Sequence, residues 1–330
     1  MDQHHHTGVR YEGAEEEHDR LAMGDLAGAA MTVLIADVGG TNTRIALADD
    51  GVVHDIARFA NDSYSGFTAV LAGYFDGRSM SSPQACRVAV AGPVTPGRAR
   101  LTNRDWSFDP VEIARALPGG QTPVTLVNDL AALGHSLPTL AASQVSEIRA
   151  GAGQGNGQAL VLGLGTGVNA CPVKKAGRGL AVFDAELGHA SLPASVFAAL
   201  AQTVGPEAER FTSAEHLFAG RGLEHLHKAL TGEDRTAAEI VTGAADTVAL
   251  TGRLLGLYAR EIVFQYLPFD GLYLAGSVAR GLIENGAGGP MIEAFSIEGP
   301  FADLARQVPL RLIIDDGAAL NGLAAMTEGR

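Results

Sequence analysis

Short apolar segments separated by turn residues recur along the chain and predict an α/β architecture. Residues 32–59 contain three of them, TVLIADV, RIALADDG and VVHDIARF, and the Asp-Gly pair in the second predicts a hairpin, so three antiparallel strands are the simplest interpretation. Buried strands are next predicted at 87–92 and 123–127. Helical spacing is found at 64–75, 111–117 and 130–137. Strands that alternate with helices place functional sites at the strand ends.

A second series of the same kind follows residues 150–159, AGAGQGNGQA, which have the composition of a linker. It opens with LVLGLGTGVNACPV, a strand, a glycine-rich turn and a strand, in the order already seen in TVLIADVGGTNTRIALADDG. Residues 195–267 are mostly helical in pattern, and strands are predicted at 271–276 and 310–316 before the helix ALNGLAAM. The two similar openings indicate a duplicated hairpin, one per domain.

Charge and composition narrow the class of partner. The chain has 330 residues, enough for about two domains, and carries 24 Lys and Arg against 37 Asp and Glu, a formal net charge of −13. Such a balance repels nucleic acid and anionic lipid, so a small-molecule partner is expected. Cys86 and Cys171 have neither disulfide-framework nor zinc-site spacing, which fits a reducing cytoplasm. We find no apolar run of ~18 residues and no signal peptide, so we expect a soluble, unexported protein without membrane partners.

The first thirty residues differ from the rest of the chain. They are polar, lack periodicity and carry seven acidic residues against two arginines. We interpret residues 1–30 as a disordered extension or tag-like segment, with the fold beginning near Met31. The run His4, His5 and His6 is able to bind a metal opportunistically, and we assign it no function.

The two glycine-rich turns, DVGGTNTR and GLGTGVN, have a composition suited to phosphate. Glycine lets the backbone approach an anion closely, and successive N–H groups in a tight turn form an anion-binding concavity. One Gly-Gly turn is often only structural, but here hydroxyl side chains follow the glycines both times. We expect the pair to clamp a polyphosphate. Neither a P-loop nor a dinucleotide fingerprint is present. The candidate residues are Asp37, which would hold a hydrated Mg²⁺, and Gly39, Gly40, Thr41, Asn42, Gly165, Thr166 and Gly167.

Asn128 and Asp129 stand where a predicted buried strand gives way to a helix. Both residue types favour helix N-caps, which is one sufficient explanation. The other is functional: a carboxylate at a strand end can accept a proton from a substrate hydroxyl that attacks phosphorus. The two explanations are compatible.

Further polar residues suit a sugar. Glu186 and His189, in FDAELGHASLP, provide an acceptor and a donor for neighbouring hydroxyls. A di-metal Glu-x-x-His motif would need a second copy on helices, and Gly188 indicates a loop instead. Glu215 is another acceptor, although a Ser/Thr-x-x-Glu-like helix start accounts for it equally well. For Trp106, the only tryptophan, packing is the default expectation.

Nine segments, taken in order, resemble one family: the bacterial glucokinases of the proteobacterial type, within the actin-like, ribonuclease-H-like ATPase superfamily. They are DVGGTNTR, VAVAGPV, LTNRDWSF, VNDLAAL, GLGTGVN, AELGHASLP, SAEHLFAGRGL, LYLAGSVARG and DDGAALNGLAAM. The chain lacks the cysteine cluster of the repressor-related sugar kinases. The resemblance implies a two-domain α/β actin-like ATPase fold with a sugar-binding cleft between the domains. It also implies ATP and Mg²⁺ as cofactors, a cytoplasmic location and a homodimer.

The resemblance assigns roles and domains. It implies a small N-terminal domain over 31–139, completed by a C-terminal helix at 317–330, and a large domain over 140–316. Asp129 would be the base acting on the sugar 6-hydroxyl. Asn128, Glu186, His189 and Glu215 would bind the sugar, and Gly276 and Ser277 would lie near adenosine.

Two positions depart from the family pattern. The second phosphate loop usually ends in glycine where this chain has Asn169, and the adenosine motif usually reads AGG where this chain has Ser277. Asparagine tolerates positive φ better than other non-glycine residues, so we expect the turn to survive. The departures concern the phosphoryl donor more than the sugar.

We therefore expect an ATP-dependent kinase of D-glucose. One alternative is the same reaction on mannose, fructose or an amino sugar, because pocket geometry decides between epimers. Another is a catalytically weak sugar sensor, against which Asp129 and Asp37 argue. An actin-like filament or chaperone ATPase would not need Glu186, His189 and Glu215 around the base.

Overall fold

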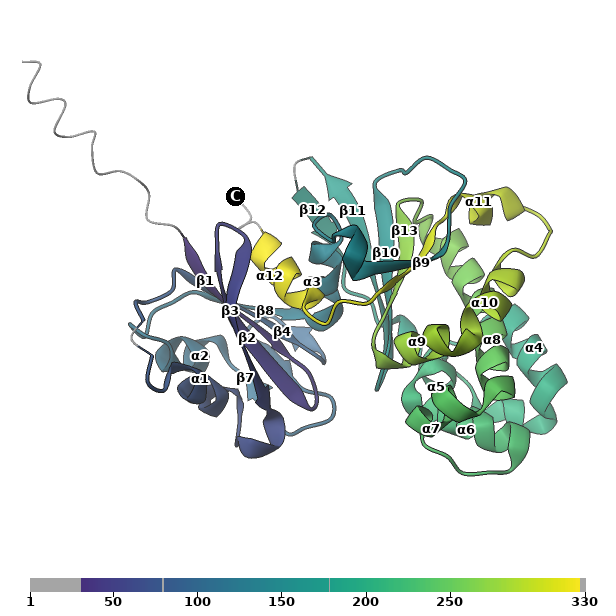
Figure 1. Cartoon of the computed structure of the whole chain (residues 1–330), viewed down its shortest axis with the longest axis horizontal. Helices are drawn as coiled ribbons and strands as arrows, with labels where there is room; N and C mark the ends of the chain where they lie inside the picture. The colour runs from purple at the N-terminus through teal and green to yellow at the C-terminus, as the bar shows by residue number, and fades with distance from the viewer. Residues whose placement is uncertain (1–30, 79, 178, 327–330) are drawn as a thin grey trace, which may run out of the picture.

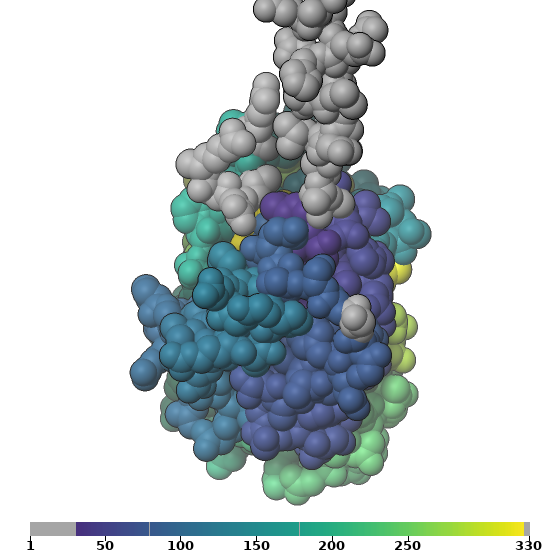
Figure 2. All heavy atoms as spheres, turned by 90° about the vertical axis from the view of Figure 1, so that its left-hand side faces the viewer, coloured from purple at the N-terminus to yellow at the C-terminus, as the bar shows by residue number. Residues whose placement is uncertain are grey.

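Two separate mixed β-sheets organise the chain (Figure 1). The computed structural model describes residues 31–78, 80–177 and 179–326. The extension predicted for residues 1–30 lies outside the described residues, as do the last four residues of the helix predicted over 317–330. Seen from the side of the first sheet, the N-terminal half of the chain covers most of the face, and helices of the other half show at its lower edge (Figure 2).

The first sheet has the order β3-β2-β1-β4-β8. Strands β1 (Thr32–Val38), β2 (Asn42–Asp49) and β3 (Val52–Ala60) are antiparallel neighbours, as predicted. Strands β4 (Ala85–Val90) and β8 (Val124–Asn128) continue the sheet parallel to β1, so their carboxyl ends meet at one edge. This arrangement brings the end of β8 to the same edge as the glycine turn after β1.

Two helices, α1 (Phe67–Phe75) and α2 (Pro110–Ala116), cover one face of this sheet (Figure 1). A small antiparallel sheet of β5 (Val94–Thr95), β6 (Arg98–Arg100) and β7 (Ser107–Phe108) lies beside them. Trp106 is 4% exposed within the core of this half, which confirms its packing role.

The second sheet has the order β12-β11-β10-β13-β14-β9 and repeats the first through five strands. The β10-β11-β12 meander is antiparallel, and β13 and β14 are parallel to β10, which confirms the predicted duplication. Its strands are β9 (Val145–Arg149), β10 (Gln158–Leu164), β11 (Val168–Ala176), β12 (Gly179–Val182), β13 (Gly271–Ala275) and β14 (Leu310–Ile313).

The segment 150–159 is not a free linker. It runs from β9 into β10 of the same sheet and packs closely on its neighbours. A Cβ at Gly151 would lie 2.4 Å from the carbonyl oxygen of Gln307, and one at Gly155 would lie 2.2 Å from Oδ1 of Asp270. Its glycines therefore serve close packing rather than flexibility.

Helices of the larger half form its main core against the second sheet. They are α4 (Ala194–Val204), α5 (Ala214–Phe218), α6 (Gly220–Thr231), α7 (Ala237–Gly243), α8 (Ala245–Tyr266), α9 (Ser277–Leu282), α10 (Gly288–Phe295) and α11 (Ala302–Gln307). Among the described residues no single helix has the length and apolarity to cross a membrane. The pair α7 and α8, bent by 100° at its break, meets that test only jointly.

Helices α3 (Asp129–Ser136) and α12 (Ala318–Ala325) lie between the two sheets (Figure 1). They cross so closely that a Cβ at Gly322 would lie 1.8 Å from the carbonyl oxygen of Ala132. The buried Arg87 of β4 donates to the carbonyl oxygen of Leu323 at 2.7 Å, which places a cation at the carboxyl end of α12. The helix α12 thus packs against the first sheet.

Candidate active site

Asn128 and Asp129 occupy the junction of β8 and α3. Asn128 is the N-cap: its Oδ1 accepts from the N–H of Leu130 at 2.9 Å. Its Nδ2 donates to the carbonyl oxygen of Gly92 at 3.1 Å, which ties the junction to the loop after β4. The capping explanation is therefore confirmed for Asn128. Asp129 is the first residue of the helix, and its side chain is not consumed by the cap.

The carboxyl group of Asp129 has a pKa raised to about 7. Burial is the largest cause, followed by the negative charge of Asp37, and the charge of Glu186 adds to both. The N–H of Leu130 opposes the shift. A group that titrates near neutrality is matched to proton transfer at that pH. The influence of Asp37, at the end of β1, and of Glu186, which follows β12, shows that both halves of the chain contribute charge near Asp129.

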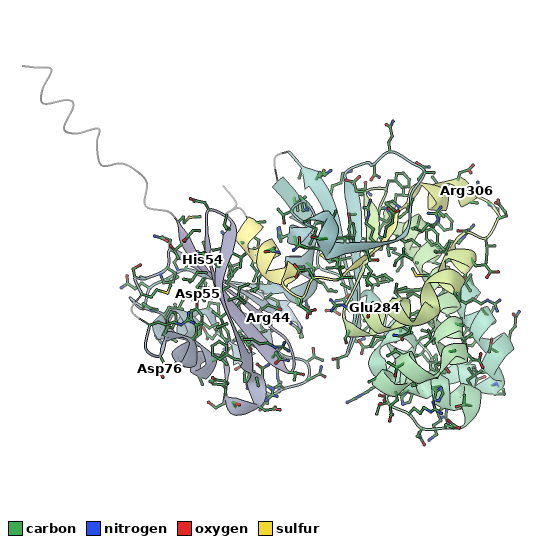
Figure 3. The ribbon with its side chains drawn as sticks, in the orientation of Figure 1. Arg44, His54, Asp55, Asp76, Glu284 and Arg306 are labelled. Atoms are coloured by element: carbon green, nitrogen blue, oxygen red, sulfur yellow. The ribbon has the colours of Figure 1, made fainter. Side chains whose placement is uncertain are left out.

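Asp37, at the end of β1, belongs to a chain of alternating charges between the two halves. Its Oδ2 lies 3.1 Å from Nη1 of Arg44, the residue opposite it on β2. Arg44 also lies 3.7 Å from Asp316, which in turn pairs with Arg280 of α9 at 3.0 Å. Figure 3 shows Arg44 on the side of the first sheet that faces α12. Burial raises the pKa of Asp37 although the ion pair with Arg44 opposes it.

Asn61 and Arg104, which the sequence did not indicate as site residues, fix the turn after β1 through hydrogen bonds to its backbone. Asn61 donates from Nδ2 to the carbonyl oxygen of Gly39 at 2.8 Å, and Nε of Arg104 donates to that of Gly40 at 3.2 Å. Arg104 also pairs with Asp62 and lies over the ring of Trp106. The sequence feature that could have indicated Arg104 is its position in the polar stretch LTNRDWSF, one of the nine segments that resemble the family. Thr41 is exposed at this turn, and Oδ1 of Asn42 accepts from Nε of Arg58 at 3.3 Å.

The second glycine turn, between β10 and β11, carries an exposed Thr166. Its backbone is closed by a bond from the N–H of Gly165 to the carbonyl oxygen of Gly167 at 2.9 Å. Glu215 of α5 accepts from the N–H of Val168 at 3.2 Å, and a Cβ at Gly167 would lie 2.8 Å from its Oε2. The helix-start explanation does not account for Glu215, because Ser213 is the N-cap and accepts from His216.

Glu186 and His189 lie on one short turn of helix, and their Oε2 and Nε2 atoms are 4.0 Å apart. Both side chains are more than half exposed, at 63% and 68%. Gly188 fits between them because a Cβ there would lie 1.8 Å from the carbonyl oxygen of Val168. The sugar candidates are therefore fixed directly against the second glycine turn.

Asn169 joins this turn to Glu186. Its Nδ2 donates to Oε2 of Glu186 at 3.2 Å, and its Oδ1 accepts from the N–H of Leu187 at 3.0 Å. It lies in β11 with negative φ, so the expected tolerance of positive φ is not needed. Asn128, Asn169 and Glu186 line one cavity of about 70 Å³. The departure from the family pattern thus contacts the sugar candidates rather than the nucleotide candidates.

Gly276 follows β13 with φ 95°, a left-handed conformation that favours glycine, and a Cβ there would lie 2.4 Å from the carbonyl oxygen of Leu164. Ser277 begins α9 and is exposed. No hydrogen bond or ion pair among the described residues joins Gly276 or Ser277 to Thr41 or Asn42 of the first turn. The structure brings Asp37, Asp129 and Glu186 within electrostatic reach of one another, and Asn128 lines the same cavity as Glu186.

The sequence and the fold were compared with those of known proteins. The chain is 28% identical over 311 residues to a glucokinase from Psychromonas ingrahamii, covering 88% of this chain and 95% of that one. It is 30% identical over 309 residues to a "bifunctional protein glk" from Burkholderia thailandensis, covering 89% of this chain but spanning about half, 48%, of that protein. The crystal structure of a glucokinase from an Antarctic psychrotroph superposes with a TM-score of 0.77 at 27% identity, covering 90% of this chain and 98% of that one.

The fold and the family follow from these matches. The duplicated sheets, with α3 and α12 between them, form the two-domain actin-like ATPase fold. The model of the glucokinase family matches residues 34–329, nearly the whole of the part that the structure describes. The chain therefore belongs to the glucokinase family.

Proposed function

We propose that the protein transfers the γ-phosphoryl group of ATP to the 6-hydroxyl of D-glucose, with Asp129 as the general base. The observation that carries this is a carboxyl group with a pKa of about 7 at the end of β8, beside Asp37 and Glu186. Membership of the glucokinase family supports the reaction class. The sensor alternative is not favoured, because binding alone requires no carboxyl group tuned to accept a proton near neutrality.

The 6-hydroxyl of glucose loses its proton as its oxygen gains the phosphoryl group. Ionised Asp129 accepts the proton of the 6-hydroxyl as its oxygen forms a bond to the γ-phosphorus, and the bond from phosphorus to the β,γ-bridging oxygen breaks. ADP leaves with the electron pair of that bond. Asn128, Glu186 and His189 hold the remaining hydroxyl groups, and this positioning supplies much of the rate enhancement.

The two glycine turns would cradle the triphosphate. Gly39, Gly40, Thr41 and Asn42 contribute the first turn, and Gly165, Thr166 and Gly167 the second. Glu215 supports the second turn through its bond to Val168 and remains a candidate sugar ligand. Gly276 and Ser277 would lie beside adenosine at the start of α9.

Asp37 fits a role in holding Mg²⁺. Magnesium often uses only one or two carboxylates together with water and substrate phosphates. Arg44 occupies Oδ2 of Asp37, and Oδ1 has no protein partner among the described residues. The described residues contain no group of three or more His, Cys, Asp or Glu able to hold a metal, which agrees with a site completed by the nucleotide. Bound magnesium would neutralise charge on the β- and γ-phosphate oxygens.

The domain division remains part of the proposal. We assign 31–139 with the C-terminal helix to the small domain and 140–316 to the large one, which is supported by β8 ending the first sheet and β9 opening the second. A cytoplasmic location and a homodimer remain predictions, and sedimentation of the purified protein tests the latter.

The pH dependence follows from the raised pKa of Asp129. The base must be ionised, so kcat/KM should rise about tenfold per pH unit below pH about 7 and level off above it. A coupled assay of glucose 6-phosphate formation between about pH 5.5 and 8.5 measures this. A flat profile across that interval would contradict the assignment of Asp129 as the base.

Replacing Asn169 with glycine should weaken glucose binding. The change removes the amide that holds Glu186 and Leu187, a loss of about 1 kcal/mol, so KM for glucose should rise roughly fivefold while KM for ATP and kcat stay near wild type. Steady-state kinetics with each substrate varied in turn separate the two. A change confined to KM for ATP would show that Asn169 acts on the nucleotide.

The direct test of function compares sugars in the same assay. With ATP and magnesium present, glucose should give the highest kcat/KM among glucose, mannose, fructose and glucosamine. Preference for another of these sugars would transfer the assignment to that sugar. Glucose binding without phosphoryl transfer from ATP would instead establish the sensor alternative.

A further inference from the structure

A larger cavity lies at the other end of the second sheet. It has a volume of about 540 Å³, within the range of small-molecule sites. Gly157, Asp270 and Pro309, which line it, directly precede β10, β13 and β14. The candidate active site lies beyond the carboxyl ends of β10 and β13. The loop from β9 to β10, which also lines this cavity, is at the top of the larger half in Figure 1. We call it the rear cavity.

The glycine-rich loop forms one wall of the rear cavity, built around Asp270. Gly157 donates its N–H to Oδ1 of Asp270 at 2.9 Å, and Gly155 passes so close that only glycine fits. The N–H groups of Gly153 and Gly155 donate to no protein acceptor in the described part of the chain. Free N–H groups in a glycine-rich loop are suited to an anion.

Two cations face the same space. The ammonium group of Lys175 lies 3.1 Å from Oδ2 of Asp270, and its side chain is 67% exposed. Among the described residues Arg311 makes hydrogen bonds only through Nη1, which donates to the carbonyl oxygen of Asp270 at 2.9 Å and to the hydroxyl of Tyr273 at 2.8 Å. Nε and Nη2 of Arg311 have no acceptor among the described residues. A guanidinium fork with two free donors matches the geometry of phosphate.

The remaining polar groups of the rear cavity suit hydroxyls. Glu147 contributes an exposed carboxylate without a protein partner in the described residues. The hydroxyl of Tyr273 accepts from Arg311, so its hydrogen is free to donate. Tyr273 contacts Arg311, and Glu147 is the partner of Arg311 in the β14–β9 register, so the phosphate donors and the hydroxyl partners lie beside each other. This combination points to a phosphorylated sugar rather than a purely apolar ligand.

Helix α3 connects the rear cavity with Asp129. Leu137 and Pro138, which line the cavity, directly follow α3, and Asp129 is its first residue. The helix spans only about 12 Å at 1.5 Å per residue. A Cβ at Gly134 would lie 3.0 Å from Cγ2 of Val173, another residue of the cavity wall, so α3 packs directly against that wall. Through this contact a ligand in the rear cavity would act on α3, whose first residue is Asp129.

We propose that the rear cavity binds a small phosphorylated sugar, and that this ligand regulates the kinase through α3. The binding claim rests on the cavity alone, and the regulatory claim rests also on the proposed function. The two are separable by experiment because the cavity residues lie outside the proposed catalytic machinery.

The experiment uses ribose 5-phosphate and inorganic phosphate as probes. Calorimetry is performed on the full chain saturated with glucose and the non-hydrolysable ATP analogue AMPPNP, so that the active site is filled. Wild type should bind ribose 5-phosphate, Lys175→Met should bind it at least tenfold more weakly, and Lys228→Met should match wild type. Lys228 is the control because it lies on α6 outside the cavity lining and, like Lys175, pairs with an aspartate: its Nζ is 2.8 Å from Oδ1 of Asp234. Ribose 5-phosphate should also change KM for glucose at least twofold in wild type and not in Lys175→Met.

Several outcomes would overturn the inference. Absence of binding, or equal binding by Lys175→Met, removes the site. Equal affinity for inorganic phosphate removes the sugar assignment, and binding without a kinetic effect removes regulation. Failure of the proposed function has a different signature: the wild type transfers no phosphate, yet it binds ribose 5-phosphate in a Lys175-dependent manner.

Discussion

Replacing Asp129 with asparagine is expected to lower kcat for glucose phosphorylation by roughly 10²–10⁴-fold, because general-base catalysis contributes about that much. Asparagine has nearly the same shape, keeps the start of α3 and cannot accept the proton of the 6-hydroxyl. The coupled assay at pH about 8, where wild-type Asp129 is ionised, measures the loss. Calorimetry should show glucose binding within a few-fold of wild type.

Stability provides the control for this variant. Folding raises the pKa of Asp129 from 3.8 to about 7, so the native state holds the proton more tightly than the unfolded chain. The stability from this group is complete below pH 3.8 and is lost as the pH rises through about 7. At pH about 8, Asp129→Asn should therefore be at least as stable as wild type. Asp234→Asn, on the surface, should leave kcat unchanged. Near-wild-type kcat in Asp129→Asn would refute the base assignment.

Replacing Gly322 with alanine is expected to destabilise the fold by about 3 kcal/mol, the upper end of typical overpacking costs. The added Cβ would lie 1.8 Å from the carbonyl oxygen of Ala132, a contact with backbone that no side-chain rotation relieves. Helices α3 and α12 would have to separate, which also disturbs Asp129. Urea unfolding followed by circular dichroism measures the loss of free energy.

Gly288→Ala is the matched control for this prediction. Gly288 lies in α10, and a Cβ there would meet nothing within 4 Å. Alanine should stabilise that helix by about 0.5–1 kcal/mol, because glycine has the larger backbone entropy in the unfolded chain. Equal stability of Gly322→Ala and wild type would show that α12 is not clamped on α3 as the structure indicates.

The elements were predictable from local pattern, and their partners were not. Hydrophobic periodicity located β1, β2 and β3, the second hairpin and the helices from 195 onward. The loop at 150–159 was misjudged, because glycine required by close packing on Asp270 and Gln307 has the same composition as glycine in a flexible linker. Only the contacts of a glycine distinguish the two.

In the candidate site, too, the sequence indicated most of the residues, and only the structure showed their contacts. Asp37, Asn128 and Asp129 were recognisable because each lies at the end of an apolar strand. The order of the family motifs indicated Glu186, His189 and Glu215. Arg44 lies in the segment DVGGTNTR, and its pairing with Asp37 follows from the register of the β1-β2 hairpin, which the sequence does not specify. The bond of Glu215 to the second glycine turn joins residues far apart in sequence, and residue type alone does not reveal it.

The sequence by itself determined the secondary structure, the duplicated hairpins and the family, because these depend on local periodicity and on short motifs in a set order. Only the tertiary structure decided the pKa of Asp129, the bond between Asn169 and Glu186, and the rear cavity behind α3. Each depends on burial or on distances between segments far apart in the chain. Desolvation and Coulombic interactions depend on position in space rather than on order along the sequence.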